Sequence, residues 1–161
     1  MKTPTDTRPA VERAHPPKWL MPLINPVMRW LIDKGRFAGR LLLLEFDGRR
    51  SGRRFRIPVG YRYLDGRRVV LTNSGWRHNL EHGADISVVQ GGTRMPVHAE
   101  LDADPGAVAA VYDRIIGDIG WQRAGRQLGI RINVDRRPTR TELEDLARRS
   151  GLSVVWLDDA S

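Results

Sequence analysis

The stretch GRRSGRRFRIPVGYRY, residues 48–63, decides the fold and carries the most specific local pattern in the chain. Its first part is a run of arginines interrupted by Gly48 and Gly52. Glycine lets the backbone turn sharply, and the planar guanidinium group binds carboxylates and phosphates through paired hydrogen bonds. We therefore expect residues 48–54 to form a loop suited to an anion.

The second part of the stretch alternates strictly, with apolar or aromatic side chains at Phe55, Ile57, Val59, Tyr61 and Tyr63. A period of two predicts a strand with one buried face. The opposite face carries Arg56 but has no bulky side chain at Pro58 or Gly60. Proline is confined to edge strands, and glycine in a strand often marks the close approach of a ligand. We expect a flat shelf for a planar ring, with arginines at its end; the alternative is a basic surface loop beside an ordinary edge strand.

The rest of the chain predicts an antiparallel sheet with helices added late. Apolar runs or alternation predict further strands at 41–46, 68–74, 85–90, 93–101 and 152–157. Asp65-Gly66 and Gly91-Gly92 are hairpin signals. Helices are predicted at 76–81, after Asp104-Pro105, at 121–128 and after a capping Thr141. This order predicts an α+β fold with a small antiparallel split β-barrel, because closure removes exposed sheet edges.

We expect a mobile segment at 1–18 and a single domain at 19–161, with a helical insertion at about 128–150. The apolar segment Trp19–Lys34 predicts a helix that either packs on the core or contacts a membrane surface or a hydrophobic channel. No apolar run reaches the ~20 residues that span a bilayer, and no signal sequence begins the chain. The expectation is a cytoplasmic protein, with peripheral membrane contact through Trp19–Lys34 left open.

The composition points to an anionic partner. Lys and Arg number 27 against 19 Asp and Glu, which gives a formal charge of +8. Such a balance suits nucleic acid, an anionic membrane or a phosphorylated small molecule. Nucleic acid is disfavoured because the aromatic residues of 55–63 point away from the arginines. The absence of cysteine excludes disulfides, thiolate catalysis and cysteine metal sites.

Other motifs that carry chemistry have weak support. His78-Asn79-Leu80-Glu81-His82 matches the His-x-x-Glu-His spacing of some zinc proteases, in which both histidines bind metal. Glycines at 75 and 83 limit that helix to barely two turns, and no third ligand is evident, so we expect no metal site. The chain also lacks a nucleophile elbow, a phosphate-binding P-loop and a dinucleotide fingerprint.

A resemblance to a known family adds to this interpretation. Residues 48–59, followed by a hairpin, a small polar turn and Trp76-x-x-Asn79-Leu80, resemble the deazaflavin-dependent nitroreductase family of split β-barrel oxidoreductases. The resemblance covers roughly residues 39–101. It implies that coenzyme F420 binds with its planar ring along the barrel and its acidic tail at the basic loop.

The resemblance also implies roles for individual residues. The tail would be held by Arg49, Arg50 and Arg56, with backbone contributions from Ser51 and Gly52. The ring would be lined by Pro58 and Val59, and its other side closed by Ser74, Gly75, Trp76 and Asn79. The acceptor would be covered by Trp30, Tyr112 and Trp121; no catalytic acid is assigned.

The implied chemistry is hydride transfer from the reduced ring to a small-molecule acceptor such as a quinone, a nitro compound or an activated alkene. Two alternatives stay open. One is a non-catalytic carrier of F420, FMN or haem on the same barrel, and the other is a basic protein that binds nucleic acid or a membrane surface. A homodimer is also left open.

Overall fold

The computed structural model describes residues 8–14 and 41–160. Contacts divide these residues into two compact units. The sheet unit comprises residues 41–103 and 153–160, and the helical unit comprises residues 8–14 and 104–152. The assignment of 19–161 to a single domain stays a prediction, and the predicted helix Trp19–Lys34 lies outside the described residues.

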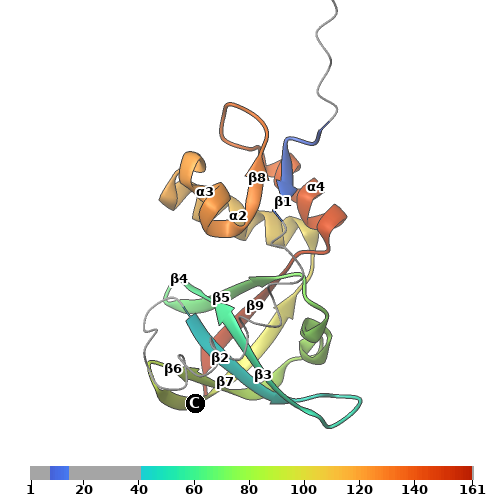
Figure 1. Cartoon of the computed structure of the whole chain (residues 1–161), viewed down its shortest axis with the longest axis vertical. Helices are drawn as coiled ribbons and strands as arrows, with labels where there is room; N and C mark the ends of the chain where they lie inside the picture. Colours follow the sequence, from blue (N-terminus) through green and yellow to red (C-terminus); the bar gives the residue numbers. More distant parts are fainter. Residues whose placement is uncertain (1–7, 15–40, 161) are drawn as a thin grey trace, which may run out of the picture. The chain divides into compact units, whose positions relative to one another are not determined.

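The sheet unit is a seven-stranded antiparallel sheet, strongly curled into a half-barrel (Figure 1). The strand order is β3-β2-β6-β7-β9-β5-β4. Their bounds are β2 Leu41–Asp47, β3 Arg54–Gly60, β4 Arg62–Leu64, β5 Arg67–Thr72, β6 Ala84–Gln90, β7 Thr93–Asp102 and β9 Ser153–Asp159, with a 3₁₀ helix η1 at Gly75–Leu80. With the helices described below, this is the predicted α+β fold, consistent with a split barrel.

The main core fills the inner face of the sheet, and a smaller buried cluster of Leu43 and Val89 lies on the outer face. The fully buried side chains of the main core come from alternate positions of the central strands: Leu42, Leu44, Val88, Val97, Ala99 and Val155. Phe55, Ile57 and Val59 of β3 pack against this cluster, as the alternation predicts. β3 ends the strand order, so Pro58 lies in an edge strand as expected.

The predicted alternation holds for the burial of Tyr61 but is wrong at Tyr63. β3 ends at Gly60, and Tyr61 lies between β3 and β4, where its side chain is buried. Tyr63 is 56% exposed, although the pattern places it on the buried face. The cause is the change of partner: β3 pairs with β2, whereas β4 pairs with β5, so the two segments do not share one continuous face.

Both predicted hairpin turns are confirmed. Asp65 and Gly66 have φ angles of 52° and 78°, and Gly91 and Gly92 have φ angles of 57° and 80°. Two successive positive φ values are what a type I′ turn requires, and this turn matches the right-handed twist of the strands it joins. Backbone geometry at these turns therefore fixes the registers of β4 with β5 and of β6 with β7.

The helical unit contains α2 (Pro105–Ile119), α3 (Trp121–Leu128), α4 (Arg140–Ser150) and a two-stranded sheet of β1 (Val11–Arg13) with β8 (Ile130–Ile132). The sequence predicts the three helices but neither short strand. β1 lies within the segment 1–18 that was expected to be mobile, and its register with β8 is antiparallel. Three residues are too few to show the period of two that predicts a strand, so these strands cannot be recognised in the sequence. None of the helices in the described part of the chain is long and apolar enough to cross a membrane.

The capping residue of α4 is Thr139, not the predicted Thr141. The Glu142 N–H donates to Thr139 Oγ1 at 3.2 Å, and the Thr139 N–H donates to Glu142 Oε2 at 2.8 Å. This reciprocal pair is a capping box, which requires Thr and Glu three residues apart. Hydrogen bonds from Arg136 lower the pKa of Glu142 from 4.5 to about 2.

Replacing Glu142 should therefore destabilise α4 in a pH-dependent way. A carboxyl whose pKa is lower in the folded state stabilises the fold above its unfolded pKa, and that contribution disappears as the pH falls through the folded pKa. Gln can still complete the capping box, so Glu142→Gln removes only the charge; we expect a cost of about 1 kcal/mol at pH 7, which shrinks between pH 4.5 and pH 2. Hydrogen exchange of the amides of residues 139–150, followed as a function of pH, measures this loss of stability.

Glu144→Gln is the matched control, because Glu144 pairs with Arg148 at 3.0 Å on the same helix without capping it. We expect this variant to cost only a few tenths of a kcal/mol, or about 0.3. Equal protection losses in the two variants, or a loss in Glu142→Gln that is the same at pH 2.5 and pH 7, would contradict the assignment.

Candidate anion-binding site

The arginine turn, defined here as residues 48–53, joins β2 to β3. It is closed by its own backbone: the Gly48 N–H donates to the Arg53 carbonyl at 2.7 Å, and the Gly52 N–H donates to the Gly48 carbonyl at 2.9 Å. Gly52 has a φ of 64°, which favours glycine. Ser51 Oγ accepts a hydrogen bond from the Arg53 N–H at 3.2 Å. The loop predicted from the sequence is therefore a defined turn.

Asn79 ties this turn to η1. Its Oδ1 accepts a hydrogen bond from the Arg49 N–H at 2.9 Å, and its Nδ2 donates to the Trp76 carbonyl at 2.8 Å. The two motifs that carried the family resemblance, the basic loop and Trp-x-x-Asn-Leu, thus meet in space. The structure gives Asn79 the role of an anchor for the turn, whereas the resemblance implied contact with a ring.

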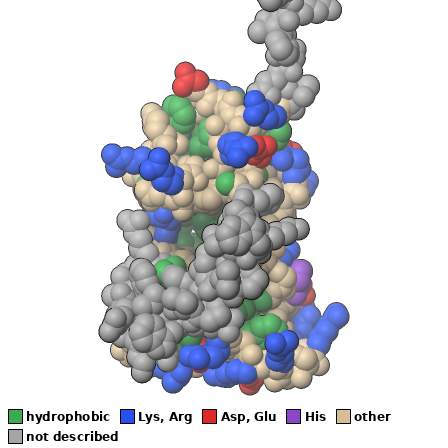
Figure 2. Space-filling model, viewed as in Figure 1, with side chains coloured by type: hydrophobic (Ala, Val, Ile, Leu, Met, Phe, Trp, Pro, Cys, Tyr) green, Lys and Arg blue, Asp and Glu red, His purple; other side chains and the backbone are tan. Residues whose placement is uncertain are grey.

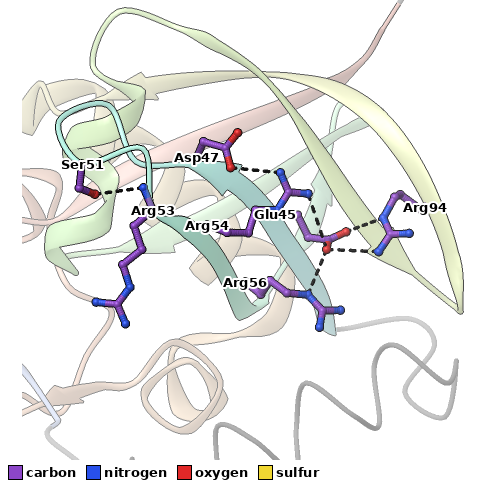
Figure 3. Close-up of polar contacts among 7 residues, drawn as sticks. All are labelled: Glu45, Asp47, Ser51, Arg53, Arg54, Arg56 and Arg94. Carbon is purple, nitrogen blue, oxygen red and sulfur yellow. Dashed lines mark hydrogen bonds and ion pairs between the residues drawn. The ribbon is translucent and has the colours of Figure 1, made fainter.

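At the tip of the turn, several hydrogen-bond donors have no acceptor among the described residues. Within the described ranges, the side chains of Arg50 and Arg53 make no hydrogen bond or ion pair, and neither do the backbone N–H groups of Arg50 and Ser51. The Arg53 guanidinium extends away from the nearby carboxylates (Figure 3). By contrast, Arg49 lies 3.6 Å from a Glu81 carboxylate oxygen. Arg50, Ser51 and Arg53 are exposed, so two guanidiniums and two amides at the surface have no acceptor among the described residues.

A second group of arginines lies further along the hairpin, around Glu45 on the outer face of the sheet (Figure 3). We call Glu45, Arg54, Arg56 and Arg94 the Glu45 cluster. Glu45 accepts hydrogen bonds from Arg56 Nε at 3.0 Å, from Arg94 Nε at 2.6 Å and from Arg94 Nη2 at 3.2 Å. Arg54 Nη2 lies 3.9 Å from the same carboxylate. Strands β2, β3 and β7 contribute to this cluster.

The local charge remains positive. Hydrogen bonding from Arg94 is the largest cause that lowers the pKa of Glu45, and it outweighs the opposing effect of burial. Glu45 is therefore ionised, and Asp47 adds a second carboxylate, 3.4 Å from Arg54. Among the described residues of this part of the sheet, three guanidiniums thus face two carboxylates. In Figure 2, Lys and Arg side chains gather along the lower part of the surface, which belongs to the sheet unit in Figure 1.

The predicted ring shelf is only partly as expected. Pro58 pairs with Leu43 and Gly60 pairs with Leu41 on the outer face of the sheet. Val59 lies on the opposite face, and its side chain packs against the core. A ligand on the outer face would therefore meet Pro58 but not the side chain of Val59. The reason is the strand period, which sends neighbouring residues to opposite faces.

The residues before and within η1 divide between surface and core. Ser74 and Gly75 are exposed. Trp76 is half-buried, and its ring centroid lies 6.2 Å from that of Phe46, which itself stacks on Phe55 at 5.3 Å. Trp76 therefore contributes to packing beside the arginine turn, and its predicted contact with a ring stays a prediction.

Of the residues predicted to cover an acceptor, Tyr112 and Trp121 belong to the helical unit. Trp30 lies outside the described residues. Tyr112 is buried within the helical unit, where burial raises its pKa to about 12. Trp121 lines an open depression of ≈ 400 Å³ on the same unit, beside Arg126 and Ile130. Tyr112 thus packs in the interior, and Trp121 borders a surface.

In the His-x-x-Glu-His segment, Glu81 contacts both His78 and Arg49. His78 Nδ1 lies 2.5 Å from Glu81 Oε1, and the other carboxylate oxygen of Glu81 faces Arg49. Over the part of the chain that the structure describes, no three His, Asp or Glu side chains are grouped as metal ligands. Glu81 acts here as a counterion to the arginine turn.

Sequence reasoning missed Glu45 and Arg94. Glu45 stands at the end of the apolar run 41–46 and has a strand partner directly opposite, Arg56. A carboxylate within a buried strand beside an arginine-rich strand was an available signal. Arg94 had no such signal, because its approach to Glu45 depends on β6 lying between β2 and β7.

The comparisons with known proteins do not identify a family. No model of a known protein family matches the chain, and no protein with a curated description matches it. The geometry of the sheet unit is therefore the basis for any functional inference.

Gly48 should be required for the shape of the arginine turn. A Cβ at this position would lie 2.8 Å from Phe55 Cε2 and 3.0 Å from Ser51 Oγ. Because Phe55 is stacked on Phe46, the clash cannot be relieved by rotating a free side chain. We expect Gly48→Ala to cost about 1–3 kcal/mol in unfolding free energy and to speed hydrogen exchange at residues 49–53. Urea unfolding and hydrogen exchange measure these effects.

Gly75→Ala provides the comparison, because a Cβ at Gly75 meets no atom within 4 Å. Its effect should stay within about 0.5 kcal/mol. If the two variants had the same stability and the same exchange at residues 49–53, the steric argument for Gly48 would be wrong.

Proposed function

We propose that this chain binds a planar redox cofactor by its anionic tail at the arginine turn, and that it is a deazaflavin-dependent reductase with coenzyme F420 as the cofactor. One observation carries the proposal: the backbone-closed turn exposes Arg50 and Arg53, whose guanidiniums, like the amides of Arg50 and Ser51, have no acceptor among the described residues. The identity of the cofactor rests on the resemblance of residues 48–59 and 76–80 to that family.

The residues of the turn suit a phosphate or carboxylate group. Guanidinium forks bind such groups through two parallel hydrogen bonds, and successive backbone N–H groups in a turn form a concave anion site. The Arg49 amide is excluded from this set because it donates to Asn79. Arg50 and Arg53 are therefore the first contacts for the tail, and Arg56, held by Glu45, lies further along the hairpin.

The outer face beyond the Glu45 cluster suits the planar part of such a ligand. Pro58 and Gly60 give β3 no long side chain on this face, which is apolar where the neighbouring Leu43 of β2 is fully buried in a cluster with Val89. When bound, coenzyme F420 supplies a hydride for an electrophilic acceptor such as a quinone, a nitro compound or an activated alkene. The chain itself contributes binding and orientation: the turn fixes the tail, and the shelf on β3 sets the plane of the ring.

Titration with oxidised F420, followed by the fluorescence of the cofactor, tests the proposal. We expect micromolar binding by the native chain. Arg50→Ala/Arg53→Ala should weaken it about 100-fold, because each lost hydrogen bond to a charged group costs at least about 1.5 kcal/mol. The matched control is Arg123→Ala/Arg148→Ala, which removes the same charge from exposed positions on α3 and α4.

The outcomes separate the alternatives. Equal losses in the two double variants would indicate a general effect of charge and contradict a site at the turn, and no binding by the native chain would remove F420. Binding without turnover of menadione would indicate a carrier, and parallel titrations with FMN and haem would identify a different cofactor. Tight binding to a random oligonucleotide that falls steeply with salt would favour a nucleic-acid protein instead.

A further inference from the structure

Glu45 occupies an unusual position for a glutamate. Its side chain is only 3% exposed, although it lies on the outer face of β2, and glutamate is rarely buried unless it is paired. The guanidiniums around it are far more accessible: the side chains of Arg56 and Arg94 are 38% and 57% exposed. The carboxylate is therefore the buried base of the cluster, and the cations are at the surface.

The contacts of Glu45 restrict the movement of two long side chains. Arg56 is held through its Nε, and Arg94 is held through both Nε and Nη2. An arginine side chain loses rotamer entropy when it is fixed, so a ligand that meets a pre-fixed guanidinium is spared that loss. Arg94 comes from β7 and approaches β2 across β6, so no local sequence contact could hold it there.

The cluster continues from the arginine turn. The turn ends at the ladder pair of Asp47 with Arg54, and Glu45 pairs with Arg56 two residues further on. Two residues of a strand span about 7 Å. An elongated ligand with two or more anionic groups could therefore contact the turn with one group and the cluster with the next.

We infer that Glu45 is a positioning residue for anion binding: it fixes Arg56 and Arg94 so that an elongated polyanionic ligand of the arginine turn binds to both groups of cations. This inference rests on the anion site of the proposed function, but it does not depend on the identity of the cofactor. The ligand class is a linear polyanion with neighbouring phosphate or carboxylate groups.

If Glu45 were only a structural counterion, its substitution by Gln would change the anion affinity in the opposite direction. Removing a carboxylate from beside a cationic site strengthens anion binding, because a repulsive charge disappears. If Glu45 positions the arginines, Glu45→Gln weakens binding even though the net charge becomes more positive. The direction of the change in affinity therefore separates the two roles.

The experiment is a calorimetric titration with tripolyphosphate, in the native chain and in Glu45→Gln. We expect binding by the native chain and about tenfold weaker binding by the variant, which is the loss of one charge-assisted contact. Asp47→Asn is the local control: Asp47 is exposed and contacts only Arg54 within this cluster. It should leave the affinity unchanged or raise it up to about threefold. Glu144→Gln on α4 is the remote control and should leave the affinity unchanged.

Each result decides the inference. Tighter binding by Glu45→Gln, or equal effects of Glu45→Gln and Asp47→Asn, would overturn it, as would a native chain that does not bind tripolyphosphate. A native chain that binds tripolyphosphate but not F420 would refute the proposed cofactor and leave this test intact. In the native chain, NMR should also show slowly exchanging Nε–H signals of Arg56 and Arg94 that shift on addition of tripolyphosphate. The absence of such shifts would overturn the inference even if Glu45→Gln did not fold.

Discussion

The pairing of β2 with β3 is the constraint on which both the core and the candidate site depend. In this register Leu42, Leu44 and Phe46 lie inside the half-barrel, and Glu45 lies outside opposite Arg56. A slip of β3 by one residue would turn Phe55, Ile57 and Val59 outward and bring arginines to the core face, because side chains alternate along a strand. Hydrophobic burial therefore fixes the register, and the register in turn places the arginine turn and the Glu45 cluster.

Local signals in the sequence predicted those parts of the fold that are decided locally. The alternation in residues 55–59 gave the buried face of β3, and the dipeptides Asp65-Gly66 and Gly91-Gly92 gave the hairpins, because backbone preferences act over a few residues. The pattern failed at Tyr63, where the partner strand changes, and at Thr141, where the capping box selects Thr139 instead. Strand pairing and side-chain competition are decided by contacts that a periodic pattern does not contain.

The candidate site was likewise predictable only where the local sequence decides it. The basic loop followed from the residues, whereas the resemblance placed Asn79 beside the ring. The contact of Asn79 with the Arg49 N–H was not predicted, because it depends on how η1 packs. Arg56 was predicted as a ligand contact, and the structure adds that Glu45 holds it. Arg94 was missed because strand order, not sequence distance, brings β7 to β2 across β6.

The excess of arginine in this chain is not by itself evidence for an anionic partner. Many guanidiniums are used within the fold, as in the two-bond pair of Arg67 with Asp158 and the pair of Arg136 with Glu142. Exposed arginines are also well solvated, so an unpaired one carries little cost. What distinguishes Arg50 and Arg53 is the backbone beneath them: the turn is closed by its own hydrogen bonds and held by Asn79. Backbone donors that are already fixed lose less entropy on binding than mobile ones, and this fixed backbone beneath the arginines, not the net charge of +8, makes the turn the strongest candidate for an anion site.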